Sequence, residues 1–309
     1  MSFEAGRGLM SKPLRKGALM TFDAVRAPGR RTLLDGLVFG EQPRWHEDRL
    51  WFSDWGRKEV MAVDLNGERE VMLRGSSFPL CVDWLPDGRL LFVSAGEGLL
   101  RRREPDGSLV VHGDLRRASD PPAGNELVVD GRGNAYVNGG GFNLAAGEPF
   151  APGVITLVTP DGSVLRVADG LAFPNGMLVT ADNSTLIVAE SYAKRLTAFD
   201  IADDGDLVNR RMWADLGDGV PDGICLDVDG AVWYADVPNK RCVRVREGGE
   251  ALATIELDRG CFACALGGPN RRTLFVTATE WNGPETMFEG APTGQVVIID
   301  APAAGAGYP

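Results

Sequence analysis

The chain has 309 residues and a formal net charge of −11, with 43 acidic side chains against 32 Lys and Arg. This balance argues against a nucleic-acid-binding protein, which usually presents a basic face, and no apolar run approaches the roughly 20 residues of a transmembrane helix. The five cysteines are an odd number scattered along the chain, so we expect buried thiols, a reducing cytoplasmic location and no disulfide framework.

The N-terminal region is basic, with seven basic and two acidic side chains in residues 1–31. It lacks the apolar segment of a secretory signal, so we interpret residues 1–28 as a flexible tail. The segment Arg30-Arg31-Thr32-Leu33-Leu34 that follows has the composition of a short strand.

A pattern of paired apolar runs then recurs six times along the chain. The middle residues of the second run in each pair are Trp51, Leu91, Tyr136, Ile187, Trp233 and Phe275, which lie 40 to 51 residues apart by subtraction. Turns rich in Asp, Asn and Gly precede these runs, and a third and a fourth run follow. Repeats of this length with several short strands each are typical of β-propellers.

We therefore predict an all-β, six-bladed β-propeller over residues 29–300, with four antiparallel strands per blade. Blade six, from Gly260 onward, supplies only three strands, so the N-terminal strand would complete it and close the ring without an exposed edge. Residues 301–309 contain few structure-forming residues and are expected to be a C-terminal tail.

Two long connections follow the second strands of blades three and six, at residues 139–153 and 280–294. Loops of this length in a compact fold are often functional. Both leave from the end of the blades where the innermost strands begin, so we expect the functional face there.

Four oxygen-bearing residues lie at the start of the innermost strands of blades one, three, four and five: Glu41, Asn125, Asn175 and Asp222. Each lies ten to twelve residues before the middle of the second run of its blade. This common offset places the four residues at one structural position, which should face the central channel. Two carboxylates and two amides suit one divalent cation. Calcium fits best, while magnesium, manganese, zinc or iron also remain candidates. The pairs Asn175-Gly176 and Asp222-Gly223 are also common turn sequences, which leaves a purely structural explanation open for them.

These motifs carry a resemblance to a known family. The sequence Glu-x-Pro-x-Trp at 41–45, Asn125 before an Asp-Gly turn, Phe-Pro-Asn-Gly at 173–176 and Pro-Asp-Gly at 221–223 resemble the SMP-30/gluconolactonase/LRE-like family. The resemblance implies Glu41, Asn175 and Asp222 as metal ligands, with Asn125 at the metal or its substrate side. It also implies hydrolysis of a lactone or related ester, with Asp222 as the candidate base.

One departure from the family pattern concerns the substrate. The sugar-lactone members carry an Arg two residues before the blade-three Asn, and this chain has Ala123 there; Glu126 also replaces the usual Asp. Loop aromatics at the functional face, Trp55, Phe142, Tyr192 and Trp281, are candidate substrate-binding residues together with Asn125. Such a pocket suits a partly apolar small molecule.

The sequence thus predicts a metal-dependent lactonase whose partner is a small-molecule substrate, with no nucleic acid or membrane partner. Two alternatives use the same residues: a hydrolase of organophosphates or aryl esters, and a propeller that binds a small molecule without catalysis. Other chemistries are less well supported. The two histidines, His46 and His112, are not placed for a Ser-His relay, and Cys261-Phe-Ala-Cys264 lacks the partner ligands of a zinc site.

Overall fold

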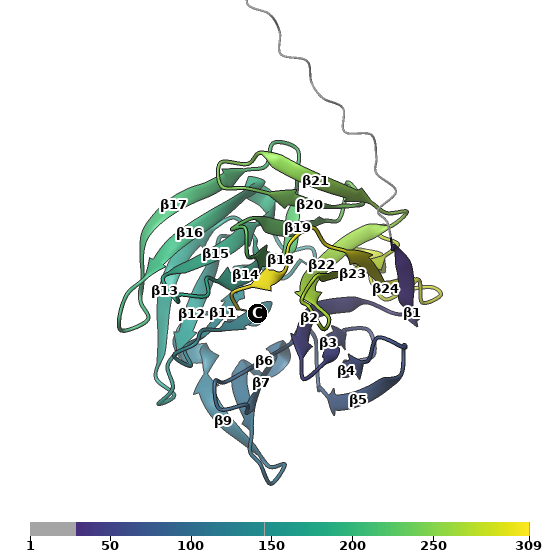
Figure 1. Ribbon diagram of the computed structural model, residues 1–309. Helices are drawn as coiled ribbons and strands as arrows, with labels where there is room; N and C mark the ends of the chain where they lie inside the picture. Colours follow the sequence, from purple (N-terminus) through teal and green to yellow (C-terminus); the bar gives the residue numbers. More distant parts are fainter. Residues whose placement is uncertain (1–28, 145, 309) are drawn as a thin grey trace, which may run out of the picture.

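The computed structural model describes residues 29–144 and 146–308, and the predicted N-terminal tail lies outside these ranges. Six antiparallel sheets are arranged in a ring around a central axis, in the order of a six-bladed β-propeller (Figure 1). Every second run identified in the sequence is the second strand of its blade, which confirms the predicted repeat.

The strands of each blade follow in chain order from the channel outward. Blade one contains β2 (Gly40–His46), β3 (Arg49–Asp54), β4 (Glu59–Val63) and β5 (Arg69–Arg74), and blade two contains β6 (Leu80–Trp84), β7 (Leu90–Ser94), β8 (Leu99–Arg103) and β9 (Leu109–Asp114). Blade three contains β10 (Glu126–Val129), β11 (Ala135–Gly139), β12 (Gly153–Val158) and β13 (Val164–Leu171), and blade four contains β14 (Pro174–Val179), β15 (Thr185–Glu190), β16 (Arg195–Ile201) and β17 (Leu207–Asp215). Blade five contains β18 (Pro221–Asp227), β19 (Val232–Asp236), β20 (Arg241–Val245) and β21 (Ala251–Glu256), and blade six contains β22 (Gly260–Gly267), β23 (Thr273–Thr279) and β24 (Gly294–Asp300).

The N-terminal strand closes the ring as predicted. Strand β1 (Arg31–Leu37) pairs antiparallel with β24 and forms the outermost strand of blade six. The first and last parts of the propeller are therefore joined by backbone hydrogen bonds, which leaves no open edge at the closure. The helical elements are single short turns: η1 (Ala95–Glu97), η2 (Leu115–Arg117), η3 (Ser191–Ala193) and η4 (Pro284–Thr286). In the part of the chain that the structure describes, none is long and apolar enough to span a membrane.

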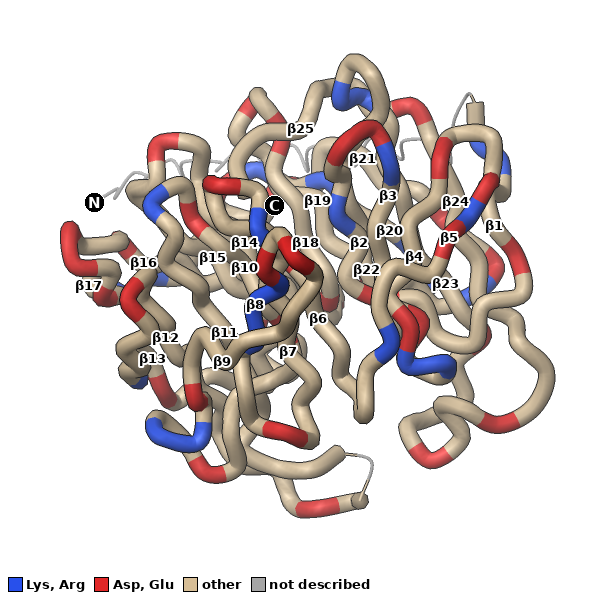
Figure 2. Tube along the Cα trace, turned by 90° about the horizontal axis from the view of Figure 1, so that it is seen from below, with Lys and Arg blue, Asp and Glu red and all other residues tan. Residues whose placement is uncertain are grey.

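The hydrophobic core consists of six separate clusters, one between each pair of neighbouring blades. Between blades three and four, for example, Val128 and Ile155 pack with Val179 and Phe199. Between blades five and six, Trp233 packs with Leu274. Each blade thus buries both faces against its neighbours, which is how a chain of this length avoids a single oversized core. The surface carries both signs of charge, with acidic and basic residues interspersed along the loops and outer strands (Figure 2).

The C-terminal residues correct the prediction of a tail after Asp300. Strand β25 (Gly305–Ala306) pairs antiparallel with the end of β18, and Tyr308 exchanges two backbone hydrogen bonds with Val179 of β14, at 2.7 and 2.8 Å. Figure 1 shows this segment lying at the central opening. Because Val179 is at the far end of its strand from Asn175, the segment covers the end of the channel opposite the predicted site. Two paired residues are too few to give a periodic sequence signal.

The innermost strands of blades four, five and six approach one another so closely that two positions accept only glycine. A Cβ on Gly176 would lie 2.6 Å from the carbonyl oxygen of Asp222, and one on Gly223 would lie 2.4 Å from the Cβ of Ala263. Both glycines are within strands, β14 and β18, so the turn explanation for Asn-Gly and Asp-Gly is wrong. The glycines instead permit backbone-to-backbone contact between blades.

This packing yields a stability prediction. Gly223→Ala should lower the free energy of unfolding by about 1–3 kcal/mol, because the added methyl group overpacks a rigid contact between β18 and β22. Urea unfolding followed by tryptophan fluorescence measures the change. The matched control is Gly140→Ala, whose added Cβ would meet its nearest neighbour at an ordinary 3.7 Å. Equal midpoints for the two variants would contradict the packing argument.

Candidate active site at the channel mouth

The four predicted ligands all lie at an irregularity at the start of an innermost strand. The strand pairing shifts register between Glu41 and Arg44, between Pro174 and Met177, and between Pro221 and Ile224. In blade three the amides of Gly124 and Asn125 both donate to the Asn138 carbonyl, at 2.9 and 2.8 Å. A β-bulge redirects side chains out of the normal alternation of a strand and often does so beside active sites. The equivalence that the sequence offsets predicted is therefore a repeated backbone feature.

Glu41 and Asp222 form a pair of like charges, of which Glu41 is buried and Asp222 half-buried. The Glu41 side chain is buried, and burial raises its pKa well above the ordinary value, with further increases from the negative charges of Asp222 and Glu126. Burial also raises the pKa of Asp222, and the charge of Glu126 raises it further. Asp222 is half-buried and keeps some contact with solvent. Excess negative charge held away from water is what a cation would relieve.

The amide ligands are fixed by neighbours from adjacent blades. Asn175 donates a hydrogen bond to Asp222, which opposes the rise in the pKa of that carboxyl, and its Nδ2 lies 3.5 Å from Ser191 Oγ. Ser191 in turn donates to the Pro221 carbonyl at 2.7 Å, next to Asp222. The Asn125 Nδ2 lies 3.4 Å from the Pro174 carbonyl, next to Asn175. These contacts bring Asn125, Asn175 and Asp222 to one part of the channel.

The donor chemistry fits a hard divalent cation. Two carboxylates and amide carbonyls are the ligand types of Ca²⁺, Mg²⁺ and Mn²⁺. Within the described ranges, no group of three His, Cys, Asp or Glu side chains is arranged as a metal site, so these residues would hold a cation only as a mixed carboxylate and amide set. All five cysteines are buried and free, and Cys261 and Cys264 belong to the packing between blades five and six.

Sequence reasoning missed a polar network that lies between blades one and three. Gln42 Nε2 donates to Glu126 Oε2, and Arg44 Nη2 lies 3.7 Å from the same oxygen and donates to the Leu127 carbonyl at 2.7 Å. Burial raises the pKa of Glu126 to about 7, although Arg44 opposes the shift. Glu126 is thus a third acidic group beside the predicted site. The signal was available, because Gln42 and Arg44 are polar residues in an innermost strand where apolar ones are expected.

Buried acids at the ends of the second strands were also missed. Asp54 accepts hydrogen bonds from the amides of Val38 and Phe39, at 3.1 and 3.2 Å, and Glu190 accepts one from the amide of Ala172 at 2.7 Å. Both therefore fix the segment that leads into the innermost strand carrying Glu41 or Asn175. A carboxylate two residues after the apolar second run, in blades one, four and five, was the sequence signal.

The four loop aromatics separate into two groups on opposite sides of the ring. Trp55 is buried, its indole N–H donates to the Leu80 carbonyl at 3.2 Å, and it stacks on Phe39. Trp281 also contacts Phe39, with ring centroids 6.1 Å apart. Phe142 and Tyr192 lie with Phe150 and Phe173 across blades three and four. Trp55 is therefore part of the packing between blades one and two, and Tyr192 is exposed.

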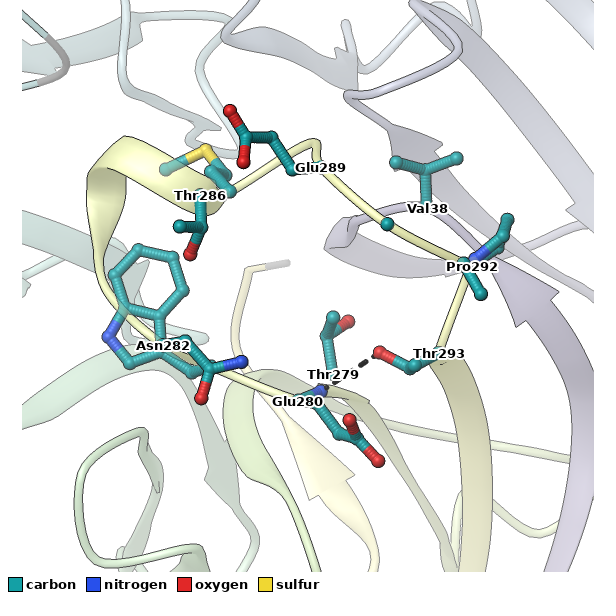
Figure 3. Close-up of a pocket in the computed structure, with 12 residues that line it drawn as sticks. Val38, Thr279, Glu280, Asn282, Thr286, Glu289, Pro292 and Thr293 are labelled. Atoms are coloured by element: carbon teal, nitrogen blue, oxygen red, sulfur yellow. Dashed lines mark hydrogen bonds between the residues drawn. The ribbon is translucent and has the colours of Figure 1, made fainter.

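A pocket of about 280 Å³ lies outside this site (Figure 3). It is lined by Val38, Thr279 and residues of the loop 280–293, and at its base the Glu280 amide donates to the Thr293 hydroxyl at 3.2 Å. Trp281 lines it, but Glu41, Asn125, Asn175 and Asp222 do not. The pocket belongs to the long loop of blade six and not to the channel.

Comparison with known proteins places the chain in a family. The model of the SMP-30/gluconolactonase/LRE-like region matches residues 39–280, so this chain belongs to that family of six-bladed propellers. Among curated relatives, a pentonolactonase of Haloferax volcanii is 25% identical over 81% of this chain and 85% of its own length. Regucalcin of Xenopus laevis is 31% identical, but the match spans 41% of this chain and 44% of the regucalcin.

Solved structures support the fold. A luciferin-regenerating enzyme matches with a TM-score of 0.77 at 18% identity, covering 90% of this chain and 97% of that one. A gluconolactonase from Xanthomonas campestris matches with a TM-score of 0.70 at 24% identity, covering 88% and 89% of the two chains. A regucalcin from Agrobacterium tumefaciens, described as a calcium-binding protein, matches with a TM-score of 0.71 at 20% identity, covering 91% and 95%.

The like-charged pair predicts an unusual pH dependence of stability. Because Glu41 and Asp222 have raised pKa values when folded, the native state binds more protons than the unfolded state above the ordinary carboxyl range, about 4. Without divalent cations, the free energy of unfolding should therefore fall as the pH rises above about 4. Asp222→Asn should reduce this fall and be more stable than the wild type at higher pH.

Chemical unfolding in the presence of chelator, at several pH values, measures both stability curves. Asp218→Asn serves as the control, because Asp218 is an exposed acid in the loop before β18 that pairs with Arg241. Parallel curves for the wild type and Asp222→Asn would show that the pair carries no stored repulsion.

Proposed function

We propose that this protein is a metal-dependent lactonase, with Glu41, Asn175 and Asp222 holding one divalent cation at the channel mouth and Asn125 beside it. The observation that carries the proposal is the pair of carboxylates, buried Glu41 and half-buried Asp222, which lie at equivalent bulges of two blades with an amide at a bulge of a third. Family membership supports lactone hydrolysis, as does the pentonolactonase among its relatives.

A bound divalent cation would supply positive charge that polarises the lactone carbonyl and favours ionisation of water. This chain's residues would do the rest. Asp222 accepts the proton from the attacking water, since it is half-buried and oriented by Asn175. The water oxygen bonds to the carbonyl carbon, the ring C–O bond breaks, and the proton passes to the departing alkoxide, giving a hydroxy acid. With a cation bound, Glu41 would be ionised and would balance part of the cation's charge.

The covered far end of the channel supports a single entrance. The C-terminal segment lies against β18 and β14 at the end opposite Asn175 and Asp222, so a small-molecule substrate would enter and leave at the mouth that carries the loops after the second strands. Calcium is the first candidate cation, because a structural relative is described as calcium-binding; magnesium, manganese, zinc and iron are to be compared directly.

The two alternatives differ from this proposal in what they turn over. An organophosphate or aryl-ester hydrolase would use the same carboxylates to direct water at phosphorus or an acyclic carbonyl. A binding protein without catalysis would gain stability with its ligand but release no product. The relatives favour a lactone as the substrate. One experiment can separate the three functions, because it follows lactone turnover, organophosphate turnover and stabilisation without product.

The test removes divalent cations with chelator, restores one at a time, and follows acid release from sugar, alkyl and aryl lactones and from one organophosphate ester. The wild type should regain turnover of a lactone with at least one cation. Asp222→Asn should reduce kcat by about 100-fold or more, because it removes both a ligand charge and the proton acceptor.

The matched control is Asp227→Asn, which alters another buried acid of blade five, at the end of β18 opposite Asp222, where it pairs with Arg244 at 2.7 Å. This control should lower the stability of the protein but leave the dependence of turnover on the cation largely unchanged. Turnover of the organophosphate alone would replace the lactonase by the first alternative. Stabilisation by a cation without any product would favour the binding role.

A further inference from the structure

A group of four aromatic side chains, here called the aromatic rim, lies at the mouth over blades three and four: Phe142, Phe150, Phe173 and Tyr192. Phe173 and Tyr192 stack with ring centroids 4.7 Å apart and planes 12° apart. Phe142 lies 5.6 Å from Phe173 and 5.6 Å from Phe150, and Phe150 lies 5.6 Å from Tyr192. These separations are within the range of favourable aromatic pairs.

The rim is built into the same backbone segments as the predicted ligands. The Ser191 amide donates to the Phe173 carbonyl and the Tyr192 amide to the Ala172 carbonyl, both at 3.1 Å. Asn175 follows Phe173 by two residues, and its side chain lies 3.5 Å from the Ser191 hydroxyl, one residue before Tyr192. The stacked rings are therefore carried by the segments that lead directly into Asn175 and away from Ser191.

The rim also reaches the site from blade three. Asn138 Nδ2 donates to the Asn175 carbonyl at 2.6 Å, and Asn138 leads through Gly139 into the loop that carries Phe142. A Cβ on Gly139 would lie 2.9 Å from the Ala123 Cα, so this loop starts directly against the segment before Asn125. Both sides of the rim are therefore anchored beside predicted ligands.

Two features are unexpected for aromatic residues that serve packing alone. Tyr192 is 51% exposed and Phe150 is 50% exposed, although they are part of one continuous cluster. Phe173 has a left-handed backbone with φ of 60°, which is unfavourable for a bulky residue and tends to occur at ligand sites. An exposed apolar cluster costs free energy, which a bound apolar group would offset.

Hydrogen-bonding groups suited to a polyhydroxylated ring are scarce on this side. Ala123, at the position where sugar-lactone members have an Arg, is 1% exposed and belongs to the core between blades two and three. The arginines of the neighbouring outer strands, Arg195 and Arg210, are paired with Glu190 at 2.9 and 3.2 Å. The rim thus offers aromatic faces in place of directed donors.

We infer that the aromatic rim is a specificity subsite that binds an apolar, preferably aryl, substituent of the lactone while the ring ester lies at Glu41, Asn175 and Asp222. The inference rests on the proposed lactonase function. It names the substrate class as apolar-substituted lactones and assigns Tyr192 and Phe173 as the residues that select it, with Phe142 and Phe150 completing the surface.

The experiment compares kcat/KM for γ-lactones that differ only in the substituent beside the ring oxygen: hydrogen, propyl or phenyl. The wild type should prefer phenyl over hydrogen. Tyr192→Leu should reduce kcat/KM for the phenyl lactone about fivefold to tenfold, mainly through KM, with a smaller loss for the unsubstituted lactone. Tyr192→Phe keeps the stacked ring and should restore most of the loss.

The matched control is His46→Leu. His46 stacks on Trp84 at 3.9 Å and 11°, but at the opposite end of the innermost strands. The His46→Leu variant loses a stacked ring of comparable geometry that lies far from the mouth, so its preference among the three substituents should be unchanged. Equal losses for Tyr192→Leu and His46→Leu, or equal losses across the three lactones, would overturn the subsite.

A binding measurement separates this inference from the proposed function. Equilibrium dialysis with 2-phenyltetrahydrofuran, which has no ester to hydrolyse, compares the wild type with Tyr192→Leu and His46→Leu. Binding weakened about fivefold or more in Tyr192→Leu alone supports the subsite even if no lactone is turned over. Turnover of lactones with no difference in ether binding and no substituent preference supports the lactonase and overturns the subsite.

Discussion

The close approach of the innermost strands is the constraint on which the rest of the structure depends. At Gly176 and Gly223 the backbones of blades four, five and six meet with no room for a Cβ. The strands accommodate this contact by bulges at their first residues, and the bulges redirect Asn175 and Asp222, the residues just before those glycines, toward the channel. The placement of Asn175 and Asp222 is thus tied to the packing of the inner strands, whereas the ring itself is closed by the pairing of β1 with β24.

The site that results is costly to maintain. Glu41 and Asp222 repel each other at the mouth, and Glu126 adds a third acidic group that is only partly balanced by Arg44. Burial strengthens this repulsion, because the effective dielectric constant is lower than in water. Other buried acids of the blades have cationic partners. Asp227 pairs with Arg244 at 2.7 Å, and Glu190 pairs with two arginines. Within the described residues Glu41 and Asp222 form no salt bridge, and carboxylates held close together in this way are typical of a site that binds and works on a ligand.

The sequence predicted the six blades and the ring closure because both depend on repeated local patterns, and these appear in the strands around Trp51 to Phe275. It did not distinguish a turn from a bulge at Asn175-Gly176, since the two conformations use the same residues. The link between Gln42 and Glu126 joins positions 84 residues apart, and no local pattern reports such a contact. Strand β25 is two residues long and is stabilised only by the edge it meets. The loop aromatics were assigned to one pocket, but blade order places Trp55 and Tyr192 on opposite sides of the ring.

The most direct measurement is the position of the bound cation. Crystals grown with Mn²⁺, with diffraction data collected at the manganese absorption edge, would locate it without reference to activity. The account predicts one anomalous peak per chain at the channel mouth, within bonding distance of oxygens from Glu41, Asn175 and Asp222, about 2.1–2.3 Å. A peak elsewhere in the molecule, or none at a concentration that stabilises the protein, would contradict the central claim that these three residues from three blades form a metal site.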